Sequence, residues 1–341
     1  MSLDGIDLAK TYPRAFVTGA AGFIGNHVVR RLVEEGVETT CLVLPHDPAP
    51  MLEGLRVRIV HGDLSDPIVL AEQMAGASIV FNLAAIYALW LPVPRTMFDV
   101  NVGGTRNVMS AARRAGVPRV VHTSSIAAIG TRPGAELADE DTPFCDWDVA
   151  SDYVLSKYIS ELEAFALAGP DLDVVAVNPA FPFGANDIGP TPTGKMVSDL
   201  LRGRLPAIVA GGFNGVDVRD VAEGHLLAAV RGESRRRYIL GGENISYRDF
   251  ANRVAKVAGR PAPRFEAPVA LFAGLGRVAE TIATHITRRP PFFTEKSVTY
   301  VAGRWLYFST ARAQHELGYR PRPIDGAIAA SVAWFKGVAT A

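Results

Sequence analysis

The chain has 341 residues, of which 48% are hydrophobic and 21% charged, so it can bury the core of one large globular protein. Its 35 lysine and arginine residues balance 35 aspartate and glutamate residues, which argues against a nucleic-acid partner and against binding to a membrane surface. The two distant cysteines, Cys41 and Cys145, and the absence of a long apolar run predict a cytoplasmic protein without disulfides, metal cluster or membrane insertion.

Strand-like and helix-like segments alternate through the first 178 residues. The strand-like segments are nearly continuous apolar runs, as expected for strands that are buried on both faces. The expected strands cover residues 15–19, 37–44, 57–61, 77–83, 119–124 and 172–178, and the expected helices cover 23–35, 67–75, 95–115 and 149–168. Because parallel strands need crossover helices, this order predicts an α/β fold with a doubly wound parallel sheet of the Rossmann type.

The regular alternation stops after residue 178. Residues 179–195 are rich in proline, glycine and threonine, which predicts an ordered loop over a site. The expected later elements are helices at 196–202, 219–231, 246–258, 267–285 and 310–317 and a strand at 236–240. We therefore expect residues 1–178 to form the Rossmann domain, with its sheet completed by later strands. Residues 179–341 should mainly form a small C-terminal lobe, interleaved with the sheet, that caps the carboxyl ends of the strands.

A glycine motif, Gly19-Ala-Ala-Gly22-Phe-Ile-Gly25, directly follows the first predicted strand. Gly19 permits a sharp exit from the strand, Gly22 lets backbone amides approach a pyrophosphate, and Gly25 lets the next helix pack close to the strand. The start of that helix then offers its free N–H groups to phosphates. The motif predicts a dinucleotide site, whose expected contacts here are Gly19, Ala21, Gly22, Phe23, Ile24 and Gly25.

Tyr153 and Lys157 are four residues apart on the predicted helix 149–168 and therefore share one face of it. A phenol with a pKa of about 10 is a poor proton donor at neutral pH, and a nearby ammonium lowers that pKa. We expect Tyr153 to be the acid/base for a carbonyl or alcohol oxygen, with Lys157 tuning its pKa and holding the nicotinamide ribose. Ser125, just past the fifth strand, is expected to hydrogen-bond the substrate oxygen, with Ser124 as the alternative.

Together these motifs resemble the extended short-chain dehydrogenase/reductase superfamily, and within it the NAD-dependent epimerase/dehydratase family. Further matches are His61-Gly-Asp63-Leu64, Asn82-Leu-Ala84-Ala85 and Asn101-Val-Gly-Gly-Thr105. The resemblance implies that Asp63 and Leu64 bracket the adenine, that Ala84 and Ala85 line the nucleotide, and that Asn101 fixes the backbone near the catalytic helix. It also implies cofactor contacts from Leu44, Ser124, Tyr153, Lys157 and Pro179, and a homodimer that pairs through the helices at 95–115 and 149–168.

Segments such as Tyr87-Ala-Leu-Trp90 and Glu316-Leu-Gly-Tyr-Arg-Pro-Arg322 resemble a narrower branch, the hopanoid-associated sugar-epimerase-like proteins near dihydroflavonol 4-reductase. The second strand ends in Leu42-Val-Leu44-Pro-His46-Asp47, with Leu44 where relatives often carry arginine. Neither an acid for the adenine ribose nor an arginine for the extra phosphate of NADP stands there. The cofactor is therefore NAD or NADP, with a preference for NAD.

Aromatic side chains are frequent in the segments expected around the substrate. We expect Tyr87, Trp90, Phe181 and Phe183 to contact the substrate together with Ser125; further aromatic candidates are Phe98, Phe213 and Phe272. This composition favours a bulky apolar or ring-shaped small molecule, and the first hypothesis is an NAD(P)-dependent oxidoreductase that interconverts its ketone and secondary alcohol. The alternatives are a nucleotide-sugar epimerase that retains bound NAD and, less favoured, a non-catalytic dinucleotide-binding regulator.

Overall fold

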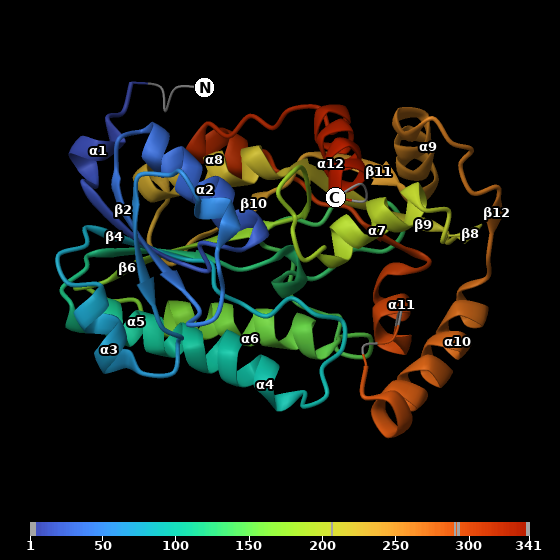
Figure 1. The fold of residues 1–341 in the computed structure, drawn as a ribbon, viewed down its shortest axis with the longest axis horizontal. Coiled ribbons are helices and arrows are strands. Elements are labelled where there is room, and N and C mark those ends of the chain that lie inside the picture. The colour runs from blue at the N-terminus through green and yellow to red at the C-terminus, as the bar shows by residue number, and fades with distance from the viewer. Residues whose placement is uncertain (1–4, 206, 290, 292–293, 339–341) are drawn as a thin grey trace.

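Seven parallel strands form the central sheet, in the order β10-β6-β5-β4-β1-β2-β3 (Figure 1). A computed structural model describes residues 5–205, 207–289, 291 and 294–338. The strands of this sheet are β1 (Arg14–Thr18), β2 (Glu38–Val43), β3 (Val57–His61), β4 (Ile79–Asn82), β5 (Arg119–Thr123), β6 (Asp173–Pro179) and β10 (Arg237–Leu240). The strand order reverses beside β1, which makes the fold doubly wound and confirms the predicted α/β class.

Helices cover both faces of the sheet (Figure 1). One layer contains α1 (Leu8–Thr11), α2 (Phe23–Glu34), α8 (Val218–Arg231) and α12 (Asp325–Val338), and the other contains α3 (Pro67–Gln73), α4 (Arg95–Phe98), α5 (Gly104–Arg114) and α6 (Asp152–Ala166). Neighbouring residues of β1 pack on opposite faces of the sheet. Val17 packs in the hydrophobic core that includes α2 and α8, whereas Phe16 packs in the core that includes α3, α5 and α6. Burial on both faces explains why the central strands β1, β4 and β6 are nearly unbroken apolar runs, whereas the edge strand β3 has no buried residue.

The predicted helix 95–115 is three consecutive pieces, because a π-helical turn at Asp99–Gly103 separates α4 from α5. Two 3₁₀ turns occupy Pro50–Leu52 and Ile126–Ala128, and further π-helical turns occupy Ala283–Thr287 and Ala313–Leu317. The helix predicted at 149–168 begins later, at Asp152, where the hydroxyl of Ser151 accepts a hydrogen bond from the amide of Val154. Serine at this position satisfies one of the free amides at the helix start.

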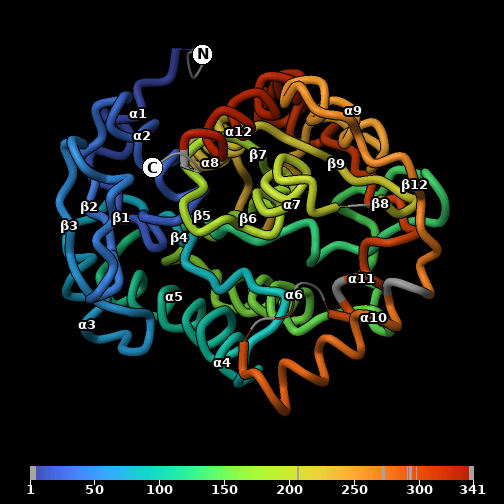
Figure 2. Tube along the Cα trace, turned by 45° about the vertical axis from the view of Figure 1, so that its right-hand side comes forward, coloured from blue at the N-terminus to red at the C-terminus, as the bar shows by residue number. Residues whose placement is uncertain are grey.

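The C-terminal lobe contains a second sheet that the sequence did not predict. Its central strand β9 (Gly211–Asp217) pairs with β11 (Glu243–Ser246), β13 (Arg304–Leu306) and β7 (Phe181–Phe183), and a short pair joins β8 (Ala207–Ile208) to β12 (Phe265–Glu266). The helices of this part are α7 (Pro192–Leu201), α9 (Tyr247–Ala258), α10 (Val269–Ile282) and α11 (Glu295–Val301). Residues 179–195, expected as a loop, therefore include β7 and the start of α7. Figure 2 shows α9, α10 and α11 on the side of the molecule away from β2 and β3.

Helix α12, which the sequence also did not predict, holds the segment that follows β7. Ser331 Oγ accepts a hydrogen bond from the amide of Gly184 (2.7 Å) and donates one to the carbonyl of the same residue (3.1 Å). The indole N–H of Trp334 donates to the carbonyl of Asp187 (3.1 Å). These contacts fix residues 184–187 above the carboxyl ends of the central strands.

Candidate active site

The glycine motif forms a tight connection between β1 and α2. Gly19 has a φ of +66°, and a Cβ there would lie 2.7 Å from the backbone nitrogen of Ala84. A Cβ on Gly25 would lie 2.0 Å from the carbonyl oxygen of Gly19, so the helix can approach the strand only without a side chain. Helix α2 starts at Phe23, and its N-cap Gly22 supplies no side-chain hydrogen bond, so the first amides stay available for an anion.

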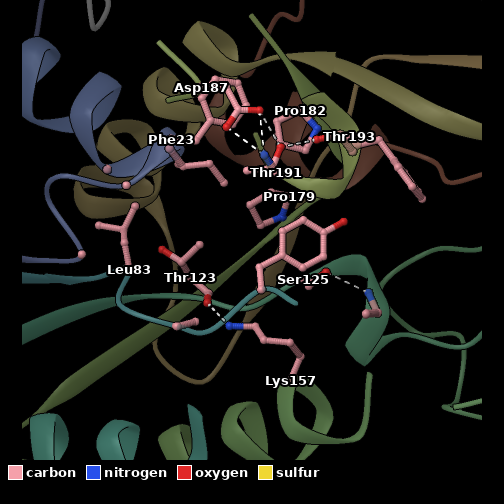
Figure 3. A pocket seen from close by; sticks show the side chains of 18 of the residues that line it. Phe23, Leu83, Thr123, Ser125, Lys157, Pro179, Pro182, Asp187, Thr191 and Thr193 are labelled. Atoms are coloured by element: carbon pink, nitrogen blue, oxygen red, sulfur yellow. Dashed lines mark hydrogen bonds between the residues drawn. The ribbon is translucent and has the colours of Figure 1, made fainter. Parts of the chain in front are cut away.

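A cavity of about 380 Å³ extends from this glycine motif to the end of β5 and to helix α6 (Figure 3). The structure brings together in its lining most of the residues that the sequence singled out. These are Gly19, Ala21, Gly22, Phe23, Ile24, Gly25, Ala85, Tyr87, Ser124, Ser125, Tyr153, Lys157, Pro179 and Phe181. The remaining lining includes Asn186, Asp187, Thr191 and Thr193; they lie in the segment 179–195 that the sequence predicted as a loop over a site, but these four residues were not singled out.

The expected adenine contacts lie outside this cavity but near the same edge of the sheet. Leu44 follows β2 and is 59% exposed. Asp63 and Leu64 follow β3; the carboxylate of Asp63 accepts a hydrogen bond from the amide of Ser65 (2.8 Å), and Leu64 is buried against α5. Because β2 lies beside β1 and β3 lies beside β2, Leu44, Asp63 and Leu64 follow the glycine motif in a row along the carboxyl edge of the sheet. Their role as cofactor contacts stays a prediction, as does that of Ala84, whose amide donates to Thr18 Oγ1 (3.1 Å).

Two of the expected substrate contacts do not line the cavity. Phe183 is 1% exposed and packs in the core, with its ring centroid 4.7 Å from that of Phe250 and 5.7 Å from that of Phe213. This corrects the prediction that Phe183 reaches substrate, and it also places Phe213 in the core. Trp90 lies in the segment after β4 but outside the cavity lining in the described part of the chain. The side chain of Phe272 lies outside the described residues.

Lys157 is buried beneath the cavity and anchored to the end of β5. Its ammonium donates a hydrogen bond to the carbonyl of Thr123 (2.7 Å), as Figure 3 shows. Ser125 Oγ accepts a hydrogen bond from the amide of Ala127 (3.1 Å), and its own O–H can donate to a second group. The ring of Tyr153 faces that of Tyr87, with 4.6 Å between their centroids. The hydroxyl, ammonium and phenol thus come from the end of β5 and one face of α6.

The environment moves the pKa values of the phenol and the ammonium in opposite directions. Burial raises the pKa of Tyr153 to about 12, although its hydrogen bond with the Ser125 side chain partly opposes this shift. Burial lowers the pKa of Lys157 to about 8, although the charge of Glu161 opposes the shift. The net shift of the Tyr153 pKa is therefore upward, because desolvation of the phenol is the largest effect; that Lys157 lowers this pKa stays a prediction.

A buried polar network that the sequence argument missed supports Ser125 and Lys157. The amide nitrogen of Asn178 donates to the carbonyl of Ser125 (2.9 Å) and to Glu161 Oε2 (2.7 Å). The other oxygen of Glu161, which is 2% exposed, lies 3.2 Å from the guanidinium of Arg237 on β10. The sequence spacing could have identified Glu161, because it follows Lys157 by four residues and so lies on the same helix face. The network links the edge strand β10 to helix α6.

Asn101 fixes the backbone beside the same helix, as the resemblance implied. Its side-chain oxygen accepts from the amide of Ile86 (2.7 Å), and its nitrogen donates to the carbonyl of Ile86 (3.0 Å) and to Ser156 Oγ (2.9 Å). The π-helical turn at Asp99–Gly103 places this side chain in the interior. Such turns often occur near functional sites, where they reorient one side chain.

Comparisons with known proteins agree with this geometry. The model of the NAD dependent epimerase/dehydratase family matches residues 15–241. A dihydroflavonol 4-reductase-like protein of Synechocystis sp. is 38% identical over 325 residues, covering 94% of both chains. Sterol demethylase protein B of Methylococcus capsulatus is 33% identical over 322 residues, covering 94% of this chain and 97% of that protein. The crystal structure of gox2253 superposes with a TM-score of 0.84 at 40% identity, covering 96% of this chain and 98% of that one.

Two kinds of feature are missing from the described part of the chain, a membrane-spanning helix and a metal-binding cluster. Among residues 5–205, 207–289, 291 and 294–338, no helix combines the length and apolar character that crossing a bilayer requires. Within the same residues, no group of three histidine, cysteine, aspartate or glutamate side chains is arranged to hold a metal ion.

Proposed function

The chain belongs to the NAD dependent epimerase/dehydratase family of the extended short-chain dehydrogenases/reductases, and we propose that it interconverts a ketone and a secondary alcohol on a bulky or ring-shaped small molecule. The observation that carries this proposal is the cavity that Tyr153, Ser125 and Lys157 share with the glycine motif. Tyr153 can then donate a proton to a substrate in the same cavity in which the glycine motif binds the phosphates of the cofactor. Tyr87, Phe181 and Tyr300 give the cavity aromatic walls, which suits a bulky apolar substrate.

The residues present fit a nicotinamide dinucleotide. The uncapped start of α2 and the glycines before it would hold the diphosphate, and Lys157 keeps two N–H groups free for ribose hydroxyls beyond its bond to Thr123. When bound, the cofactor supplies or accepts the hydride. We propose NAD in preference to NADP, because Leu44 offers no positive charge to an added phosphate.

Tyr153 and Ser125 supply the proton and the hydrogen bond to the reacting oxygen. With a pKa of about 12, the phenol of Tyr153 holds its proton at neutral pH and can donate it to the oxygen of a ketone as negative charge develops there. The O–H of Ser125 can donate to the same oxygen and so stabilise that charge. In the direction of oxidation, Tyr153 takes the proton back from the alcohol.

The alternative, a nucleotide-sugar epimerase with tightly bound NAD, uses the same three residues but should also bind the substrate diphosphate. Among the described residues that line the cavity, Lys157 is the one cation, and its place is beneath Tyr153. Arg219 and Lys195, which could have served a diphosphate, are paired with Asp217 and Asp199. This composition favours the oxidoreductase. A homodimer that pairs through α5 and α6 stays a prediction from the family resemblance.

Tyr153→Phe tests the proposal. The purified protein is first examined for a retained nucleotide, and then NADH and NADPH oxidation is measured against a panel of bulky ketones. We expect the variant to bind NADH as the wild type does and to lose turnover by about 10²- to 10⁴-fold. Tyr158→Phe is the matched control, because Tyr158 lies on the same helix but stacks on Phe144 (4.4 Å between centroids), and it should keep full turnover.

Unchanged turnover in Tyr153→Phe would refute the proposed acid/base. Retained NAD without net consumption of NADH, together with interconversion of sugar nucleotide epimers, would support the epimerase instead. A protein that binds NAD but turns over neither kind of substrate would support the regulator.

A further inference from the structure

Helix α10 presents a row of large apolar side chains to solvent. The row consists of Leu275, Val278, Ile282 and Ile286, which are 51%, 58%, 42% and 74% exposed. The first three belong to α10, and Ile286 belongs to the π-helical turn that continues it. Their spacing of three or four residues places them on one face of the helix. A contiguous apolar patch of this kind on a protein surface often marks an interaction site.

The opposite face of α10 attaches the helix to the protein. Gly276 and Ala283 are buried, and a Cβ on Gly276 would lie 2.8 Å from the backbone nitrogen of Glu295 at the start of α11. The guanidinium of Arg277 forms an ion pair with the carboxylate of Glu295. Figures 1 and 2 both place α10 at the outer rim of the C-terminal lobe, outside α11. The apolar row therefore faces away from the rest of the protein.

The charge at the end of the apolar row is positive. Arg288 and Arg289 follow the π-helical turn and are both exposed. Residues 281–289 contain no aspartate or glutamate. Glu280 precedes Ile282 by two residues and so lies on the opposite side of the helix. The balanced charge of the whole chain, which argued against a membrane surface, therefore does not describe this region.

The combination of an apolar row with two adjacent arginines distinguishes between the bodies that could cover this face. A second copy of the chain would cover the apolar side chains, but its own α10 face offers no acid to pair with Arg288 and Arg289. An anionic lipid surface offers hydrocarbon to the apolar side chains and phosphate groups to the arginines. The lipid surface therefore matches both features of the face.

We propose that the outer face of α10, made of Leu275, Val278, Ile282, Ile286, Arg288 and Arg289, binds reversibly to an anionic lipid surface. The helix axis then lies in the plane of the interface, as is usual for amphipathic helices that bind lipid from one side. At 1.5 Å per residue, the apolar row is about 16 Å long. The proposal is independent of the proposed function, because none of its six residues lines the cavity that contains Tyr153.

Co-sedimentation with vesicles tests the proposal. One set of vesicles contains phosphatidylcholine alone, and the other contains phosphatidylcholine mixed with anionic phosphatidylglycerol. The wild type should bind the mixed vesicles more tightly, with an affinity that falls as salt is added. Val278→Glu and Ile282→Glu should each weaken this binding at least about tenfold, because they remove an apolar contact and add a negative charge. Val257→Glu on α9 is the control, because Val257 is 42% exposed, as Ile282 is, but lies outside the proposed face.

A second set of variants tests the arginines. Replacing Arg288 and Arg289 together by glutamine should lower the affinity for mixed vesicles by about fivefold for each arginine. The affinity for phosphatidylcholine vesicles should not change. Arg58→Gln is the matched control, because Arg58 is also exposed but lies on β3, on the other side of the molecule (Figure 2), and it should bind as the wild type does.

Four outcomes would overturn the proposal. The first is a wild type that sediments with neither kind of vesicle. The second is wild-type affinity in Val278→Glu and Ile282→Glu, because binding would then not use the apolar row. The third is equal affinity of the wild type for both kinds of vesicle, because the arginines would then have no role. The fourth is loss of an oligomer in Val278→Glu, measured by light scattering, in a protein whose wild type binds no vesicles, because a second copy would then cover the face.

Discussion

The contact between Gly25 and Gly19 allows one residue to be tested for both fold and cofactor binding. In Gly25→Ala, the new Cβ would lie 2.0 Å from the carbonyl oxygen of Gly19, 2.9 Å from its carbonyl carbon and 3.1 Å from the Cα of Ala20. All three neighbours are backbone atoms, so no side chain can rotate away. An added methyl group in a packed site is usually unfavourable by about 1–3 kcal/mol, and a contact this short belongs at the upper end.

We therefore expect Gly25→Ala to lower the free energy of unfolding in urea by about 3 kcal/mol. Because relief of the contact must move either the start of α2 or the Gly19 turn, NAD binding measured by calorimetry should weaken at least tenfold. Gly274→Ala is the control, since a Cβ at this helical position in α10 meets no atom within 4 Å. It should leave NAD affinity unchanged and stabilise the chain by about 0.5–1 kcal/mol. A Gly25→Ala protein with wild-type stability and NAD affinity would refute the reasoning.

The remaining predictions concern the buried charges below Tyr153. The pKa of Lys157 is lowered from 10.5 to about 8, so between these values the unfolded chain binds the extra proton and stability rises with pH. Lys157→Met should therefore raise the free energy of unfolding at pH 7 by up to about 3 kcal/mol, measured by urea titration. This gain should shrink as the pH rises towards 10. A variant that is equally or less stable than the wild type at pH 7 would contradict the prediction. Glu161→Gln removes the buried partner of Arg237 and should destabilise the chain by about 1–3 kcal/mol. Glu161→Gln should also lower the pKa of Lys157 further, as measured by NMR of labelled lysine. Glu163→Gln is the control, because it breaks the exposed pair with Arg106 on the same helix. It should change the free energy of unfolding by less than about 1 kcal/mol and leave the pKa of Lys157 unchanged.

The features that the sequence predicted correctly depend on local rules. The central strands β1, β4 and β6 could be recognised because burial on both faces makes them nearly continuous apolar runs; in β1, for example, Phe16 and Val17 pack in two different cores. The glycine motif could be recognised from the sequence because Gly25 packs against Gly19, only six positions earlier in the chain. In each of these cases the pattern can be recognised within a few consecutive residues, even where the packing partners, as for Phe16, are distant in the sequence.

The second sheet escaped prediction because distant residues select its sequence. Strand β9 is rich in glycine, which ordinarily indicates a loop. A Cβ on Gly211 would lie 2.2 Å from the carbonyl oxygen of Arg304, and one on Gly215 would lie 2.2 Å from the side chain of Ile324. The glycines are therefore packing requirements set by residues about a hundred positions away, which no local pattern reveals.

Burial also explains why spacing located Tyr153 and Lys157 but could not give the net direction of the Tyr153 pKa shift. The four-residue interval correctly placed Tyr153 and Lys157 on one face of α6. Their electrostatics depend on depth, and in the folded chain the ammonium donates to the carbonyl of Thr123 while desolvation raises the pKa of the phenol to about 12. Under the proposed function, this has a directional consequence: at neutral pH nearly every Tyr153 side chain carries its proton, so the form that donates to a ketone is abundant although weakly acidic, and the phenolate that could accept a proton from an alcohol is scarce. Reduction is then favoured at neutral pH, and oxidation should accelerate as pH rises and the phenolate fraction grows.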